Sequence, residues 1–184
     1  MTSLKSSSHE QILPVNDCGT GRLVVVCGLP GSGKTTLAKR LEGKLRAVRL
    51  APDEWMDALS INLYDEASRE KVEALQWELG RALLKLGLVV IIEWGTWARC
   101  ERDALRLGAR ALGAAVELHY VSAPPEVLFE RIQHRGRENP AITQEAVSRW
   151  FATFQVPTHE EMALFDMPLE GDSASGSLRC NSGA

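Results

Sequence analysis

The chain has 184 residues, of which 45% are hydrophobic and 24% charged, values typical of one globular domain with a substantial core. Its formal net charge of -3 excludes a general electrostatic attraction to nucleic acids or anionic membranes, although a local basic patch is compatible with it. The cysteines show neither a CxxC pair nor metal-site spacing, so we expect free thiols. No stretch has the length of a membrane span and no apolar signal core follows the N-terminus, so we expect a cytoplasmic chain without a membrane partner.

Apolar runs of strand length alternate with helix-like periodicity along the chain. We expect strands at 22–27, 47–51, 88–92 and 115–121, helices at 34–45, 98–112 and 125–134, helical material at 54–86 and a further helix from 143. This alternation predicts an α/β fold with a central parallel sheet covered by helices on both faces. We expect residues 21–168 to form the domain, with flexible tails at 1–20 and 169–184.

A phosphate-binding loop stands between the first expected strand and the first expected helix. Residues 28–35 read GLPGSGKT, the Walker A pattern, and the strand and helix beside it oppose the alternative of an unrelated glycine-rich turn. In this pattern backbone N–H groups surround phosphate oxygens, Lys34 reaches the outer phosphates and Thr35 offers its hydroxyl to Mg²⁺. We therefore expect ATP and Mg²⁺ as cofactors. The expected nucleotide-binding residues of the loop are Gly28, Leu29, Pro30, Gly31, Ser32, Gly33, Lys34, Thr35 and Thr36.

The residue that follows the second expected strand is a candidate general base. Parallel sheets bind ligands beyond the carboxyl ends of their strands, so Asp53 is expected on the same rim as Lys34. Phosphoryl transfer to an alcohol needs a carboxylate that orients the hydroxyl and accepts its proton close to the metal. The position of Asp53 also suits the N-cap of the following helix, and both roles can hold together.

The third expected strand is apolar throughout, as in a strand buried on both faces, and is followed by Glu93. A carboxylate there can hold Mg²⁺ or position a reacting group, so the expected metal site comprises Thr35, Asp53 and Glu93, with a surface glutamate as the alternative for Glu93. Trp94 and Trp97 come next. They could line an acceptor pocket, and core packing is an equally good interpretation.

Two arginine pairs follow on later helices. Arg99 and Arg102 lie one turn apart and are candidate substrate contacts, with exposed helix charges as the alternative for Arg99. Arg131 and Arg135 share a helix face beside Gly136, which predicts a small lid. Guanidinium groups closing over a triphosphate would stabilise charge during transfer, so both are expected catalytic residues and Arg135 is also expected to bind the nucleotide. A basic, solvated helix end is the alternative.

Together these motifs resemble the P-loop kinases of the nucleoside-monophosphate-kinase-like class, in particular the kinase branch of AAA-type domains that includes the kinase domain of polynucleotide kinase. Zeta toxins and chloramphenicol phosphotransferase are more distantly similar. The resemblance runs from about residue 22 to 166, through GLPGSGKT, PDEW (52–55), ERD (101–103), ERIQHRGR (130–137) and FQVPTHEE (154–161). It implies a three-layer P-loop NTPase fold with a small helical lid. It also implies Asp53 as base, Arg131 and Arg135 in the lid, and a role for Arg102 at the acceptor.

The expected activity is that of a kinase, a phosphotransferase that moves the γ-phosphate of ATP to a hydroxyl of a small molecule. Glu93 stands where polynucleotide kinases commonly have aspartate, and Trp55 and Met56 stand where their acceptor-binding arginine usually follows the base. A nucleic-acid acceptor, as in a polynucleotide 5′-hydroxyl kinase, is therefore an alternative that we do not favour. A nucleotide-dependent switch or ATPase without an acceptor is a further alternative, and the absence of an NKxD motif after the fourth expected strand makes it weaker.

Overall fold

The computed structural model describes residues 19–136 and 141–169. Its strands are β1 (Arg22–Cys27), β2 (Val48–Leu50), β3 (Val89–Gly95) and β4 (Ala115–Tyr120). Its helices are α1 (Lys34–Leu45), α2 (Pro52–Ala58), α3 (Glu66–Lys85), α4 (Arg99–Arg110), α5 (Pro125–Arg135), α6 (Gln144–Thr153) and α7 (His159–Met162). In this described part of the chain, no helix combines the length and the apolar character needed to cross a bilayer.

The four strands form one sheet in the order β2-β3-β1-β4, and every pairing is parallel. This confirms the predicted α/β class. Successive side chains of a strand point to opposite faces, and here both faces are buried. On one face Val24, Val26 and Ile91 pack with Ala38 and Leu41 of α1.

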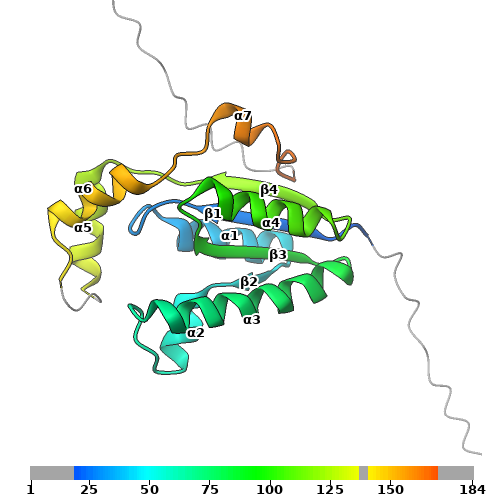
Figure 1. Cartoon of the computed structure of the whole chain (residues 1–184), viewed down its shortest axis with the longest axis horizontal. Helices are drawn as coiled ribbons and strands as arrows, with labels where there is room; N and C mark the ends of the chain where they lie inside the picture. The colour runs from blue at the N-terminus through cyan, green and yellow to red at the C-terminus, as the bar shows by residue number, and fades with distance from the viewer. Residues whose placement is uncertain (1–18, 137–140, 170–184) are drawn as a thin grey trace, which may run out of the picture.

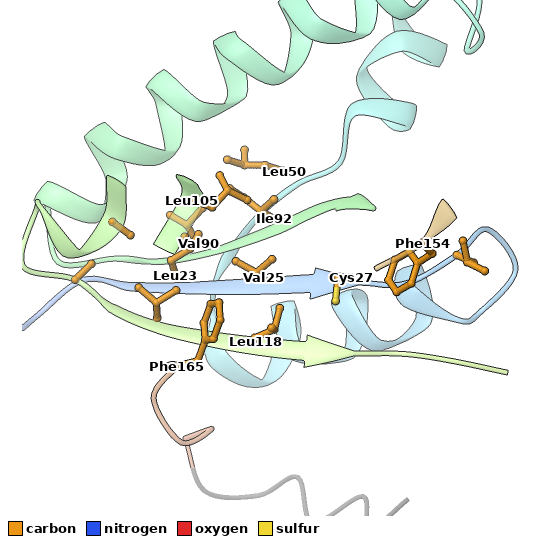
Figure 2. Close-up of a cluster of buried hydrophobic side chains, with 14 of the residues drawn as sticks. Leu23, Val25, Cys27, Leu50, Val90, Ile92, Leu105, Leu118, Phe154 and Phe165 are labelled. Atoms are coloured by element: carbon orange, nitrogen blue, oxygen red, sulfur yellow. The ribbon is translucent and has the colours of Figure 1, made fainter. Parts of the chain in front are cut away.

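The other face of the sheet packs against α3 and α4 (Figure 1). The hydrophobic cluster on this face includes residues from β1, β3, α3 and α4: Leu23, Val25, Val90, Ile92, Leu84, Leu105 and Ala109. Figure 2 shows this cluster along β1, from Leu23 at one end to Cys27 beside Phe154 at the other. Helices therefore cover both faces, as the three-layer P-loop fold requires.

Two element boundaries differ from the sequence-based expectation. The strand expected at 88–92 extends to Gly95, which pairs with Cys27 of β1, so Glu93 lies inside β3 and not after it. The register shifts between Val25 and Cys27, and pairing with β1 resumes at Gly95, an irregularity that an apolar pattern cannot reveal. The helical material expected at 54–86 forms two helices, and the second begins where the side chain of Asp65 accepts a hydrogen bond from Ser68 N at 3.1 Å.

The chain after α6 returns along the outer edge of β4. The backbone N–H of Asp166 donates to Val116 O at 2.8 Å, and the Asp166 carboxylate accepts from Val116 N at 2.6 Å. Further along, Leu169 N donates to the Glu117 side chain at 3.1 Å. This segment covers the edge that β4 would otherwise expose, and α7 within it was not predicted from the sequence.

Candidate active site

A cleft of about 1700 Å³ lies beyond the carboxyl ends of β1, β2 and β3. Its walls come from the loop after β1, from α2 and α3 on one side, and from α4 and α5 on the other. Pockets for one small ligand commonly have about 300–1,000 Å³. The larger volume here can hold a nucleotide together with a second molecule.

The loop from residue 28 to 35 requires glycine at defined positions. Gly28 has φ 144°, and a Cβ there would lie 2.1 Å from Val121 O, which follows β4. Gly31 has φ 80°, and a Cβ there would lie 2.9 Å from Leu128 O of α5. Both positions therefore combine the left-handed region with a close approach of backbone, so no other residue fits without displacement.

The start of α1 is built to receive an anion. Gly33 is its N-cap, no side chain caps it, and its first turn contains no acidic residue. Ser32 Oγ is buried and has no hydrogen-bond partner within the described ranges. The first-turn N–H groups of a helix need an acceptor from outside the helix, and a phosphate supplies several.

Lys34 extends from this helix start into the cleft. Its Nζ donates to Leu29 O at 3.0 Å. Burial lowers the pKa of Lys34, the carboxylates of Glu93 and Asp53 act in the opposite direction, and the charge of Arg135 lowers the pKa further. The electrostatic influence of both carboxylates on Lys34 places the three side chains around one space, as the sequence predicted.

Glu93 is held between two donors. The Thr35 hydroxyl donates to Glu93 Oε1, and Arg49 Nη1 donates to Glu93 Oε2 at 2.9 Å. Arg49 is only 7% exposed and also contacts Glu42 at 3.2 Å and Glu54 at 2.6 Å. Sequence analysis missed Arg49, because an arginine in a three-residue strand gives no sign that three carboxylates from other elements converge on it.

The side chains of Thr35 and Glu93 are suited to hold a magnesium ion together with phosphate oxygens. Mg²⁺ prefers oxygen ligands and keeps several of its waters, so one hydroxyl and one adjacent carboxylate are enough protein contacts beside a nucleotide. No three Asp, Glu, His or Cys side chains in residues 19–136 and 141–169 form a metal cage of their own. Asp53, the third expected ligand, is instead engaged by an arginine.

Asp53 lies on the α2 side of the cleft and is 68% exposed at its side chain. Arg69 Nη2 of α3 donates to Asp53 Oδ1 at 2.6 Å and to Leu63 O at 3.3 Å. The N-cap of α2 is Ala51, so the suggestion that Asp53 caps this helix is wrong. Arg69 was missed because it reaches the carboxylate from 16 residues away across the loop between two helices.

Arg131 and Arg135 both line the cleft from α5. Arg131 Nη1 donates to Gly31 O at 3.2 Å and to Ser32 O at 3.4 Å, so this arginine holds the backbone of the phosphate loop. Arg135 lies close enough to Lys34 to lower its pKa. Residues 137–140, between α5 and α6, fall outside the described residues.

The two tryptophans after β3 both line the cleft and pack against other side chains. Trp94 Nε1 donates to Gln76 Oε1 at 2.8 Å, and the Trp97 ring meets the Trp150 ring edge-on with centroids 6.1 Å apart. Both tryptophans therefore pack within the fold and also line the cleft. Trp77 of α3 lines the cleft as well.

Arg102 is a structural residue in this fold, which corrects the expectation that it contacts substrate. Its side chain is 0% exposed and forms two hydrogen bonds with Glu161, of 2.6 and 3.0 Å. The remaining donors reach the carbonyl oxygens of Thr96, Trp97 and Gln155 at 2.9, 3.2 and 2.8 Å. With all its donors used inside the fold, the guanidinium has none to offer an acceptor.

Arg99 lies outside the cleft lining. Its Nε pairs with Asp103 at 3.4 Å, one turn further along the exposed face of α4. Its backbone N–H donates to Gln155 Oε1 at 2.8 Å. This arrangement agrees with the alternative of an exposed helix charge.

Comparison with known proteins identifies relatives of this fold. A profile of the AAA domain family matches residues 23–157. A UPF0200 protein of Thermococcus kodakarensis is 31% identical over 143 residues, which are 67% of this chain and 73% of that protein.

Solved structures of P-loop kinases share the architecture. A chain of the Pnkp1/Rnl/Hen1 RNA repair complex has a TM-score of 0.63 and 22% identity, covering 82% of this chain and 48% of its own length. The APS kinase of Mycobacterium tuberculosis, solved with AMPPNP and APS, has a TM-score of 0.55 and 22% identity. The match covers 68% of this chain and 78% of the APS kinase chain. At these identities the likeness establishes the fold, and it confirms the resemblance to P-loop kinases read from the motifs.

Proposed function

Because this chain belongs to the AAA domain family and adopts a P-loop kinase fold, we propose that it transfers the γ-phosphoryl group of ATP to a hydroxyl of a small molecule. One observation carries the proposal. The exposed carboxylate of Asp53 shares a cleft with Lys34 and the phosphate loop, and Arg69 holds it there. A nucleotide switch needs the loop but has no use for an oriented carboxylate at a second, spacious subsite.

On the donor side, the loop N–H groups and the start of α1 bind the phosphates of ATP. Lys34 leaves Leu29 O and contacts the outer phosphates, where its positive charge opposes the negative charge that develops during transfer. Arg131 keeps the loop in shape, and Arg135 adds charge from the α5 side. Mg²⁺, held with the phosphates by Thr35 and Glu93, would neutralise phosphate charge.

On the acceptor side, Asp53 accepts the proton of the attacking hydroxyl. Arg69 fixes the position of the carboxylate through its 2.6 Å contact, and an ionised carboxylate is the form that can take a proton. The tryptophans at the end of β3 provide an apolar wall that excludes water from the reacting groups. Without this exclusion, water would compete with the acceptor hydroxyl.

A polynucleotide acceptor is the second candidate, because the fold is shared with a chain of an RNA repair complex. The charges near Asp53 oppose it. Glu66, Glu73 and Glu101 line this part of the cleft together with the single arginine Arg69, as far as residues 19–136 and 141–169 extend. A phosphodiester chain would meet more negative than positive charge there.

The test is acceptor-dependent release of ADP from ATP across a panel of hydroxylated small molecules, with a 5′-hydroxyl oligonucleotide in parallel. We expect small-molecule acceptors to stimulate ADP release, and Lys34→Ala to abolish it with loss of ATP affinity. Stimulation by the oligonucleotide alone would replace the small-molecule proposal with the second candidate. ADP release at one rate with and without every acceptor would refute the kinase assignment.

A further inference from the structure

Basic and acidic side chains are distributed unevenly over the cleft. The basic residues Lys34, Lys39, Arg40, Arg131 and Arg135 come from α1 and α5. The opposite end lies at α3, the end of β3 and the start of α4 (Figure 1), and we call it the acceptor end. It is formed by Arg69, Glu73, Trp77, Trp94, Thr96 and Glu101.

Glu73 links the acceptor end to the expected base. Arg69 lies between them, with Nη2 at 2.6 Å from Asp53 Oδ1 and Nη1 at 3.8 Å from Glu73 Oε1. The Glu73 side chain is only 26% exposed. Burial raises its pKa to about 7; Glu101, Asp53 and Glu70 act in the same direction, and Arg69 opposes them. One guanidinium thus faces several carboxylates, and the excess charge at this end is negative.

Thr96 supplies an independent sign that a ligand binds here. In the sequence Thr96 stands between Trp94 and Trp97, and it lines the cleft with them. The residue is 5% exposed, and its Oγ1 has no hydrogen-bond partner within the described ranges. Buried hydroxyls in folded proteins almost always have a partner, because leaving one unpaired is unfavourable. A hydroxyl on the cleft wall acquires its partner when a polar group of a ligand arrives.

Resting on the kinase activity proposed above, we propose that the acceptor carries a protonated amino group beside its hydroxyl, as amino sugars and amino alcohols do. An ammonium group has three donors and no acceptor, so Glu73, Glu101 and the Thr96 hydroxyl are suitable partners. Indole rings attract cations over their faces, and Trp77, Trp94 and Trp97 line the same space. A neutral polyol would use the rings and the hydroxyl without needing the negative charge.

The amino group takes no part in the bonds that form and break during phosphoryl transfer. The hydroxyl oxygen of the acceptor forms a bond to the γ-phosphorus while the bond from that phosphorus to the β–γ bridging oxygen breaks. The hydroxyl proton passes to Asp53, and ADP leaves with the bond electrons. The amine stays protonated, has no free electron pair to attack phosphorus, and so serves only to position the hydroxyl.

The test uses the full chain and matched acceptor pairs that differ in one group, glucosamine with glucose, galactosamine with galactose, and 2-aminoethanol with ethylene glycol. We expect at least one amine to support ADP release with kcat/KM about tenfold or more above its neutral counterpart at pH 7.5, the gain of about one charge-assisted contact. Glu73→Gln and Thr96→Val should each raise KM for that amine while the affinity for ATP stays unchanged. Glu78→Gln on the exposed face of the same helix is the matched control.

The pH dependence separates a charge effect from a structural one. For 2-aminoethanol, whose amine stays protonated over this range, the preference over ethylene glycol should grow from pH 6 to pH 8 as Glu73 ionises beside Arg69, Glu70, Asp53 and Glu101, and should lose this dependence in Glu73→Gln. Neutral acceptors phosphorylated as well as amines, or an amine preference unchanged in both variants, would overturn the inference and leave the kinase intact. No stimulation by any acceptor, the oligonucleotide included, would count against the kinase proposal itself, whereas stimulation by the oligonucleotide alone would reject the small-molecule acceptor and this inference with it.

Discussion

Arg102 tests whether a side chain expected at the acceptor instead holds the fold together. Replacing it with alanine leaves the Glu161 carboxylate, which is 1% exposed, without its cation. Removing one partner of a buried ion pair costs about 3–5 kcal/mol. The carbonyl groups of Thr96, Trp97 and Gln155 also lose a donor, at about 1 kcal/mol each.

The summed loss approaches the whole stability of a domain, about 5–15 kcal/mol. We therefore expect Arg102→Ala to be largely unfolded, or to unfold at a much lower urea concentration than the unchanged protein. Tryptophan fluorescence measured against urea concentration monitors the unfolding. Arg99→Ala, which removes an exposed pair on the same helix, should cost less than about 1 kcal/mol. The double variant Arg102→Met with Glu161→Met removes both charges and should recover a large part of the loss.

A different outcome would refute this reasoning. If Arg102→Ala kept the urea midpoint of the unchanged protein and only raised KM for an acceptor, Arg102 would contact substrate after all. The structural role would also be rejected if the double variant were less stable than Arg102→Ala.

Three further predictions concern the cleft. Gly28→Ala should abolish nucleotide binding in a titration calorimetry experiment, because its Cβ would lie 2.1 Å from Val121 O at φ 144°; normal affinity would contradict the required glycine. Glu93→Gln should leave the Arg49 guanidinium without an ionised partner there and weaken ATP binding in the presence of Mg²⁺ by roughly tenfold, with a smaller effect in EDTA; equal effects would argue against a metal role. Glu73 binds a proton more tightly in the folded than in the unfolded chain, so the free energy of unfolding should fall as pH rises from about 4.5 to about 7, by on the order of 1–2 kcal/mol after allowance for solvent screening. The urea midpoints of the unchanged protein and of Glu73→Gln, measured at pH 5 and pH 8, test the direction of this change. A difference in midpoint between the two proteins that does not vary with pH would reject the prediction.

Local patterns in the sequence were enough to predict the glycine loop and the strand and helix beside it. The bounds of α1 agree with the predicted 34–45, and the glycine loop lies at the end of a buried parallel strand. These features depend on contiguous residues, whose periodicity and backbone preferences can be read directly. The position of Asp53 on the same cleft followed from the rule that parallel strands end on one edge.

The other side of the cleft depended on contacts between distant elements. Arg69 meets Asp53 across the turn between α2 and α3, and Glu161 meets Arg102 from 59 residues away. Helical periodicity shows which residues share a face but not which face is covered by a segment that arrives later in the chain. For that reason the sequence could not distinguish an arginine that binds substrate from one enclosed by α7.

Transfer of labelled phosphate from [γ-³²P]ATP, compared between the unchanged protein and Asp53→Asn in the presence of the acceptor panel, tests the central claim most directly. We predict label on an acceptor hydroxyl with the unchanged protein. In Asp53→Asn transfer should be slower by about 10²–10⁴-fold with unchanged ATP affinity, the contribution expected of a general base. Labelled inorganic phosphate released at equal rates by both proteins, without any labelled acceptor, would contradict the account.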